Sequence, residues 1–388
     1  MAMKTDAPPA KGHTLDRMLS VIDLGVARIL DRSLEGRDIG VEEAVTLFGA
    51  KDLELHALCM VANELRKRAV GDIVTYVTVR NINFTNICYT GCRFCAFAKH
   101  FGDEGAETLT IDEVAHRAEE AWQAGATEVC MQGGLHPKMT GYEYRDMVIA
   151  IKERVPEIHI HAFSPFEIQY GTRKTGLSTR DFLLMLKEVG LGTIPGTAAE
   201  ILDSDIRRTL TKDKLSAESW VEIIKTAHEL GVRSSSTIMY GHVDAPIHWA
   251  NHMAIIREVQ QETGGFTEFV PLGFVHWNSP IYLDGTARAG PTGMEDLRMH
   301  AVARIMLNNH IKNIQVSWVK LGQKFAQMCL NAGANDFGGT LMNEKISRSA
   351  GAPYGQYMSP EEFQRLIRDM GRVPAQRSTT YDLLQVYE

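Results

Sequence analysis

The sequence predicts a (β/α)8 barrel of the TIM type with an N-terminal helical extension, and three observations lead to this fold class. After about residue 72, short β-branched or aromatic runs alternate with amphipathic helical segments, as in βα units around a parallel sheet. Eight such runs can be counted, and eight parallel strands close into a barrel. At 388 residues, 44% of them hydrophobic, the chain can also bury a large core.

Two segments precede the first predicted strand. Residues 1–12 are rich in Pro, Ala and Lys and show no periodicity, which predicts a disordered N-terminus. Residues 13–71 show helical patterns only, such as LELHALCMVANELRKRAVG, which ends at Gly71. They are predicted to form the helical extension, and residues 72–388 are predicted to form the barrel with a C-terminal helical tail.

Each of the eight predicted strands is followed by helical sequence. The strands cover residues 75–84, 127–133, 158–163, 192–197, 234–240, 267–274, 311–318 and 336–342. Capping-box spacing marks three helix starts, at Thr110 with Glu113, Thr292 with Glu295 and Ser359 with Glu362, the last with Pro360 in its first turn. An open doubly wound sheet is the competing architecture, but no G-x-G-x-x-G follows the first strand. In a barrel, the active site is expected at the C-terminal strand ends.

Charge and hydropathy narrow the class of partner. The 48 acidic residues outnumber the 41 basic ones, so the net charge of −7 gives no footprint for nucleic acid or an anionic membrane surface. The first residues lack the apolar core of a secretion signal, and no apolar run is long enough to span a bilayer. We therefore expect a cytoplasmic protein with small-molecule partners.

Three cysteines, Cys88, Cys92 and Cys95, lie in NICYTGCRFCAF, directly after the first predicted strand. Iron–sulfur clusters are held by thiolates, and a 4Fe-4S cluster with three cysteines keeps one iron open for chemistry. Structural zinc is the alternative, but it requires four ligands, and His100 is the one nearby candidate for the fourth. The isolated Cys59, Cys130 and Cys329 are interpreted as core residues.

The motif C-x-x-x-C-x-x-C, with Phe94 before its last cysteine, resembles the signature of the radical S-adenosylmethionine superfamily. This resemblance implies that the three thiolates hold a 4Fe-4S cluster. The open iron would bind the amino and carboxylate groups of S-adenosylmethionine, and one electron would release a 5′-deoxyadenosyl radical.

The same resemblance implies four further cofactor-binding residues. Gly133 and Gly134 stand where the superfamily contacts the methionine amine, Ser164 follows strand three, and Glu200 closes strand four, where a carboxylate can accept both ribose hydroxyls. The alternatives are an ordinary turn for the two glycines and a solvated residue at a helix start for Glu200.

Within the superfamily, residues 72–381 resemble the FO synthase subunit type, on the segments CMQGGLHP, IHIHAFSPFEI, IPGTAAEIL and DFGGTLMNEKISRSAGA. This likeness implies cleavage of the Cα–Cβ bond of L-tyrosine and transfer of its 4-hydroxybenzyl group to 5-amino-6-(D-ribitylamino)uracil. It also implies a partner radical enzyme that completes the deazaflavin FO, and an electron donor such as ferredoxin or flavodoxin.

His161, Tyr240 and Arg348 are the predicted catalytic residues. Alternation along strand three places His159, His161 and Phe163 on the interior face of the barrel. Tyr240 follows strand five, and Arg348 could grip a carboxylate. A core histidine and a surface arginine are the alternatives. Four further candidates for orienting polar substrate groups are His242, His276, Asn278 and Lys320.

Two other functions remain open on the sequence. An aminofutalosine synthase of menaquinone biosynthesis would share the cluster and the GGLHP element, although Gln132 and the dipeptide SP after HAF favour the tyrosine-using subunit. A non-catalytic metal-binding scaffold would belong to another class, since fold alone does not establish function. The open cluster iron argues against a scaffold.

Overall fold

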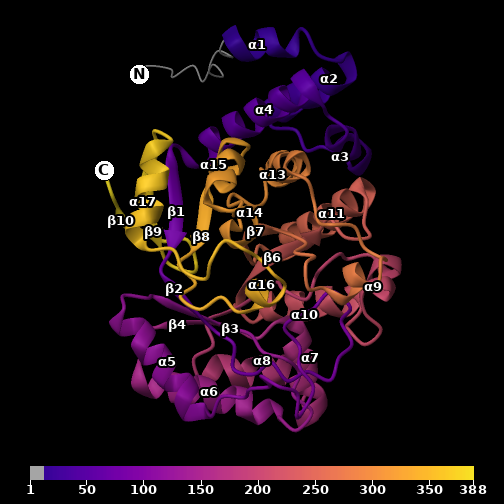
Figure 1. Ribbon diagram of the computed structural model, residues 1–388. Helices are drawn as coiled ribbons and strands as arrows, with labels where there is room; N and C mark the ends of the chain where they lie inside the picture. The colour runs from indigo at the N-terminus through magenta and orange to yellow at the C-terminus, as the bar shows by residue number, and fades with distance from the viewer. Residues whose placement is uncertain (1–12) are drawn as a thin grey trace.

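A computed structural model describes residues 13–388 of the chain, so the predicted disorder of residues 1–12 lies outside the described residues. The predicted helical extension is formed by α1 (His13–Leu19), α2 (Leu24–Leu34), α3 (Val41–Phe48) and α4 (Asp52–Val70). α4 ends at Gly71, whose φ of 67° is readily adopted by glycine. The extension packs on the outside of the barrel, with α4 against α13 and α15 and α3 against α11 (Figure 1).

The barrel wall is mainly a six-stranded parallel sheet in which the strands follow one another in sequence order. These strands are β2 (Val79–Ile82), β3 (Glu128–Met131), β4 (His159–Ala162), β5 (Thr193–Ile194), β6 (Arg233–Tyr240) and β7 (Phe266–Gly273). The wall continues through β1 (Ile73–Val77), which leads into β2 and pairs in parallel with β8 (Asp336–Gly339). The predicted fold class is thus confirmed.

The seventh predicted strand is the exception to regular pairing. Ile314 bridges Phe269 of β7, and Gln315 bridges Asp336 of β8, so residues 314–315 join the two sheets without forming a ladder. The helix α14 (Trp318–Leu321) begins directly afterwards and leaves little room for a longer strand. The hydrogen-bonded pairing around the barrel is therefore least extensive at the seventh strand position, although all eight strand positions are occupied in the predicted order.

Helices cover the outside of the wall, and the predicted capping residues begin three of them. Thr110 and Thr292 form complete capping boxes at α5 and α13, whereas Ser359 caps α17 through its hydroxyl alone. The helices after β2 are α5 (Ile111–Gln123), α6 (Gly141–Arg154), α7 (Pro165–Thr175), α8 (Thr179–Glu188), α9 (Ser204–Leu210), α10 (Ala217–Glu229), α11 (Pro246–Thr263), α12 (Pro280–Leu283), α13 (Gly293–Leu307), α14, α15 (Gln323–Asn331), α16 (Ile346–Ser349) and α17 (Pro360–Asp369). No helix among residues 13–388 combines the length and the apolar composition needed to cross a membrane.

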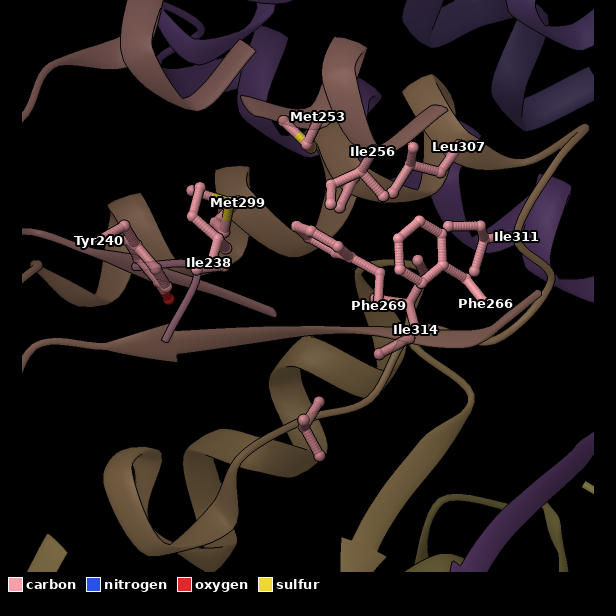
Figure 2. Packing of buried hydrophobic residues seen from close by; sticks show 14 of the residues in the cluster. Ile238, Tyr240, Met253, Ile256, Phe266, Phe269, Met299, Leu307, Ile311 and Ile314 are labelled. Carbon is pink, nitrogen blue, oxygen red and sulfur yellow. The ribbon is translucent and has the colours of Figure 1, made fainter. Parts of the chain in front are cut away.

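The core between wall and helices determines which residues of each strand face inward. Figure 2 shows Ile238 and Tyr240 of β6 and Phe269 of β7 on the side of Met253 and Met299, which belong to α11 and α13. All five side chains are buried, and burial of large apolar groups is the main stabilising contribution to such a layer. Because side chains alternate along a strand, Ser235, Thr237 and Met239 of β6 point into the barrel.

The chain after α17 differs from the predicted helical tail. It forms β9 (Val373–Arg377) and β10 (Leu383–Val386), seen in yellow beside β1 in Figure 1. β9 runs parallel to β1 on the edge opposite β8, at the N-terminal half of the first barrel strand. There Arg377 donates to Asp336 of β8 and Thr379 donates to Glu128 of β3. Edge pairing and these two contacts hold the C-terminal segment as strands at the N-terminal end of the barrel.

Candidate active site

The three clustered cysteines line one cavity, as the sequence predicts. Cys88, Cys92 and Cys95 lie in the loop between β2 and α5 and border an open cavity of about 250 Å³ at the C-terminal strand ends. The loop is held in place by backbone hydrogen bonds, from Cys88 N to Lys99 O and from Tyr89 N to Leu135 O.

The thiol surroundings suit an iron–sulfur cluster. The Leu135 N–H donates to Cys88 Sγ at 3.3 Å, the Thr90 hydroxyl lies 3.0 Å from the same sulfur, and the Thr211 hydroxyl lies 3.5 Å from Cys92 Sγ. Hydrogen bonds to sulfur are one means by which proteins tune such clusters. Among residues 13–388, no three His, Cys, Asp or Glu side chains converge on the position of a single metal ion. Thiols that stand apart can each bind a different iron of one cluster, so the donor set fits a 4Fe-4S group.

Gly133 and Gly134 follow β3 and border the same cavity. A Cβ at Gly133 would lie 2.5 Å from the Phe84 ring, and a Cβ at Gly134 would lie 2.4 Å from the carbonyl oxygen of Ile87. The Gly134 N–H also donates to Thr85 O at 2.8 Å. Two glycines are therefore required for the end of β3 to approach the cysteine loop, whether or not their backbone also contacts a cofactor.

Glu200 lines the cavity in a buried ion pair with Lys214. Lys214 Nζ lies 2.5 Å from Glu200 Oε1, and the two side chains are 8% and 13% exposed. Burial alone would raise the pKa of Glu200, but the Lys214 ammonium outweighs it and holds that pKa below its usual value. Lys214 also stands 4.8 Å from the Phe94 ring centroid, so it links Glu200 to the cysteine loop. The sequence interpretation missed Lys214, which lies in a polar loop between two helices.

Ser164 is hydrogen-bonded to Glu167, a buried residue that the sequence interpretation also missed. Ser164 caps α7, and both its N–H and its hydroxyl donate to Glu167 Oε2, at 2.7 and 2.6 Å. Glu167 Oε1 accepts from Gly133 N at 3.0 Å. Burial raises the pKa of Glu167 to about 7 in spite of these hydrogen bonds. The capping-box spacing of Ser164 and Glu167 was the available signal.

Arg207 fixes the loop that carries Glu200. Ala198 and Glu200 have φ values of 70° and 45°, which non-glycine residues rarely adopt. The buried guanidinium of Arg207 donates to the carbonyl oxygens of Ala198, Ala199 and Ile201. It also donates to Leu215 O at 2.5 Å, one residue after Lys214. The Arg207 side chain therefore holds in place both the segment that carries Glu200 and the segment that carries Lys214.

A second cavity, of about 240 Å³, lies inside the barrel and shares lining residues with the first. Thr197, Thr237 and Lys320 border both cavities. Lys320 Nζ donates to Ser347 Oγ at 3.1 Å, and burial lowers its pKa. We call the second cavity the lumen chamber; Cys130, predicted as core, lines it.

His161 lies in the lumen chamber and not beside the cysteines. Its Nδ1 is 2.7 Å from Thr193 Oγ1, and burial lowers its pKa to about 3, so the imidazole is neutral near pH 7. Phe163, predicted on the same face, turns out of the barrel because its φ is 58° at the strand end, and it stacks on Tyr144 of α6.

Two of the predicted catalytic residues lie outside both cavities. Tyr240 faces the helices (Figure 2), because Thr237 and Met239 take the inward positions of β6. Its hydroxyl donates to Asp296 Oδ1 at 2.6 Å. Arg348 is exposed and donates to Gln356 at 2.6 Å. His242, His276 and Asn278 also line neither cavity. Instead, His242 is hydrogen-bonded to Met239 O, His276 packs against Trp277, and Asn278 donates to Ser349 O.

The fold and the cysteine cavity define a radical S-adenosylmethionine protein, and the comparisons with known proteins agree. The profile of the Radical SAM superfamily matches residues 82–254, and the profile "CofH/MqnC C-terminal region" matches residues 263–388. Enzymes of this superfamily use a 4Fe-4S cluster and S-adenosylmethionine. Methylornithine synthase PylB and the hydrogenase maturase HydG share the fold, with TM-scores of 0.71 and 0.72 at 18% and 16% identity. They cover 89% and 95% of this chain, which covers 97% and 79% of theirs.

Similarity to curated proteins identifies the family. The 5-amino-6-(D-ribitylamino)uracil–L-tyrosine 4-hydroxyphenyl transferase of Methanocaldococcus jannaschii is 52% identical over 352 residues, covering 90% of this chain and 98% of that protein. The FO synthase of Streptomyces coelicolor is 55% identical over 340 residues, covering 88% of this chain and 39% of the synthase. The chain belongs to this FO synthase and 4-hydroxyphenyl transferase family. It spans about two fifths of the length of the FO synthases that it matches.

Proposed function

We propose that the chain is a radical S-adenosylmethionine enzyme of deazaflavin FO biosynthesis that transfers the 4-hydroxybenzyl group of L-tyrosine to 5-amino-6-(D-ribitylamino)uracil. The observation that carries this proposal is the 52% identity to an enzyme named for this transfer, across 98% of its length. The three-cysteine cavity supports it, because this cavity adjoins the lumen chamber, whose largely apolar walls carry several polar groups and leave room for substrates.

The residues of the cavity that the three cysteines border would hold the cofactors. Cys88, Cys92 and Cys95 would bind the cluster, which when present supplies the electron that converts S-adenosylmethionine into a 5′-deoxyadenosyl radical. The backbone at Gly133 and Gly134 would face the methionine end. Two side chains would complete the site, Glu200 on the ribose hydroxyls and Ser164 at the N-terminus of α7.

The cavity walls would protect and orient the reacting groups. Apolar side chains cover much of the surface near the cysteines, which limits the access of water to a reactive species. They are Phe94, Phe97, Phe166, Met239, Leu272 and Phe274. Lys320 lies where the two cavities meet and would pair with the carboxylate of the amino acid substrate. His161 would then donate or accept a hydrogen bond as a neutral imidazole deeper in the barrel.

Turnover after anaerobic reconstitution tests the proposed function. The reconstituted protein, a reductant and S-adenosylmethionine are incubated with L-tyrosine and the ribityl-uracil, or with the enolpyruvyl benzoate used by aminofutalosine synthases. We expect 5′-deoxyadenosine and the 4-hydroxybenzyl adduct in the first mixture. Product in the second mixture alone would replace the proposal with the menaquinone function, and no 5′-deoxyadenosine in either would favour the scaffold.

Cys92→Ala and Cys59→Ala give a matched pair of controls. The first should lose bound iron and all 5′-deoxyadenosine formation while staying folded, because its loop contributes little to the barrel core. The second lies in α4, outside both cavities, and should keep both properties.

The cellular location and the protein partners of the chain are also proposals. Six free cysteines fit a reducing cytoplasm, where disulfides are rare. A ferredoxin or flavodoxin would supply the electron. A second radical enzyme would close the deazaflavin ring, which fits the greater length of the FO synthases.

A further inference from the structure

The lumen chamber departs from the usual interior of a TIM-type barrel. Such barrels fill their interior with layers of branched apolar side chains, so that no space is left for a ligand. Here polar side chains face about 240 Å³ of space inside the barrel. These side chains include Asn81, Asn83, Glu128, His161, Glu268 and Gln315. A hollow interior in which polar groups are set among apolar walls indicates a binding chamber.

Several acceptors in the chamber have no protein partner. Asn81 Oδ1, Asn83 Oδ1 and Thr197 Oγ1 are buried, and none has a hydrogen bond within the described chain. Asn83 is only 4% exposed, and its amide nitrogen is already bonded to Gln132 O at 3.1 Å. An unsatisfied buried polar group is costly. The open positions on the two asparagines call for a ligand that presents several O–H or N–H donors.

The charges of the chamber disfavour an anionic ligand. Glu128 and Glu268 both face the space. Two cations also line the chamber. The Arg377 guanidinium is already bonded to Asp336, at 2.5 and 3.1 Å, and Lys320 lies at the junction with the first cavity, bonded to Ser347. A phosphate or carboxylate placed near Glu128 would meet like charge with little screening. Glu268, whose pKa is raised by burial to about 7, would add part of a charge near neutral pH.

We propose that the lumen chamber binds the polyol chain of the acceptor substrate, and that Glu128 and Glu268 select the unphosphorylated chain. This assignment rests on the proposed function, because it takes a ribityl-uracil as the acceptor. The polyol hydroxyls supply the donors that the two asparagine oxygens lack. They also supply further donors to Glu128 and Glu268, which already accept from the hydroxyls of Thr379 and Thr267. The heterocycle then lies at the junction of the cavities, beside Lys320, nearer to the cysteines.

Direct binding to the reconstituted protein tests the assignment without turnover. Three compounds are titrated calorimetrically: the ribityl-uracil, its monoester with phosphate on the terminal hydroxyl, and 5,6-diaminouracil without a chain. We expect the last two to bind the wild type at least about tenfold more weakly than the first, since the loss of two or more hydrogen bonds or the addition of a repulsive charge has this order of effect. Glu128→Gln and Glu268→Gln should reduce the difference in affinity between the ribityl-uracil and its phosphate monoester.

Asn81→Leu separates binding from folding. The side-chain oxygen of Asn81 has no hydrogen-bond partner among residues 13–388, so a leucine of similar shape should leave the melting temperature unchanged or raise it. The same substitution should weaken ribityl-uracil binding about fivefold to tenfold. Asn308→Leu is the matched control, because Asn308 also has an unpartnered buried Oδ1 but lies at the end of α13, outside the chamber.

Two results would overturn the chamber assignment. One is equal binding of diaminouracil and ribityl-uracil, and the other is equal binding of the phosphate ester and the free polyol by the wild type. Either result leaves the proposed function intact if the same preparation forms the 4-hydroxybenzyl adduct. Absence of the adduct, with chain-dependent binding that Asn81→Leu weakens, would instead overturn the reaction and keep the chamber as a polyol site.

Discussion

Lys214 Nζ lies 2.5 Å from Glu200 Oε1 in a part of the active-site cavity where both side chains are almost fully buried. The pairing keeps the Glu200 carboxylate charged, since the ammonium group outweighs the effect of burial on its pKa. A charged carboxylate accepts hydrogen bonds from hydroxyl groups better than a neutral one does. Lys214 therefore prepares Glu200 for the ribose contact that we propose.

We expect Lys214→Met to lower the free energy of unfolding by about 3–5 kcal/mol, because it leaves a buried carboxylate unpaired. It should also weaken S-adenosylmethionine binding by at least about tenfold. Adding Glu200→Gln to this variant should restore most of the stability but not the binding. Chemical denaturation and equilibrium binding measure the two effects.

Lys225→Met is the control for Lys214→Met. Lys225 and Glu262 also lie 2.5 Å apart, but the pair is on the surface, with exposures of 32% and 60%. Surface pairs contribute about 0–1 kcal/mol, so this variant should be nearly as stable as the wild type. Equal losses of stability in the two lysine variants would contradict the role given to the buried pair.

Gly134→Ala should disturb the cysteine loop, because the new Cβ would lie 2.4 Å from Ile87 O. Overpacking of this kind typically costs about 1–3 kcal/mol, and here the strain would displace the segment next to Cys88. We expect a lower melting temperature and less bound iron per chain after reconstitution. Gly91→Ala, in the same loop with nothing within 4 Å of the new Cβ, should change neither quantity. Full iron content in the Gly134 variant would be inconsistent with this account.

Glu167 should make stability depend on pH in an unusual direction. Burial raises its pKa from 4.5 to about 7 in the folded protein. Between these values the folded chain holds a proton that the unfolded chain has lost, so the contribution to stability falls as pH rises from about 4.5 to 7. This difference in pKa corresponds to a loss of about 3 kcal/mol in the free energy of unfolding.

Glu167→Gln removes the titrating group, so its unfolding free energy should change less than that of the wild type between pH 4.5 and pH 7. Glu113→Gln changes the corresponding capping-box residue of α5, which is exposed and whose pKa is lowered by hydrogen bonds from Thr110. That variant should keep the wild-type slope in this window. Identical slopes for wild type and Glu167→Gln would refute the assignment of the group.

The fold was largely predictable because hydrophobic alternation and capping residues are local signals. They located all eight strand positions and the helix starts at Thr110 and Thr292. The cysteine spacing placed the loop at the correct end of the barrel for the same reason. β9 could not be predicted in this way, since its strand conformation depends on the edge of β1, about 300 residues earlier in the chain.

The polar site residues were harder to predict because the inward or outward direction of a side chain depends on strand register. Thr237 and Met239 face the cavity, so Tyr240 on the same strand does not. Lys214 and Arg377 reach the two cavities from segments that carry no strand pattern in the sequence. Only the assembled barrel brings Lys214 beside Glu200 and Arg377 beside Asp336.

Tyr240→Phe tests this distinction between position in sequence and direction in space. The hydroxyl of Tyr240 donates to Asp296, a largely buried carboxyl whose pKa is raised by burial to about 6, so its removal leaves a buried acceptor without a donor. We expect unfolding to become easier by about 1–3 kcal/mol. The KM values for both proposed substrates should stay unchanged, because the ring packs against Trp249 and not against the cavity. Thr237→Val alters an inward side chain three residues earlier and should raise KM for the ribityl-uracil instead. A rise in KM with Tyr240→Phe, at unchanged stability, would place Tyr240 back among the substrate-binding residues.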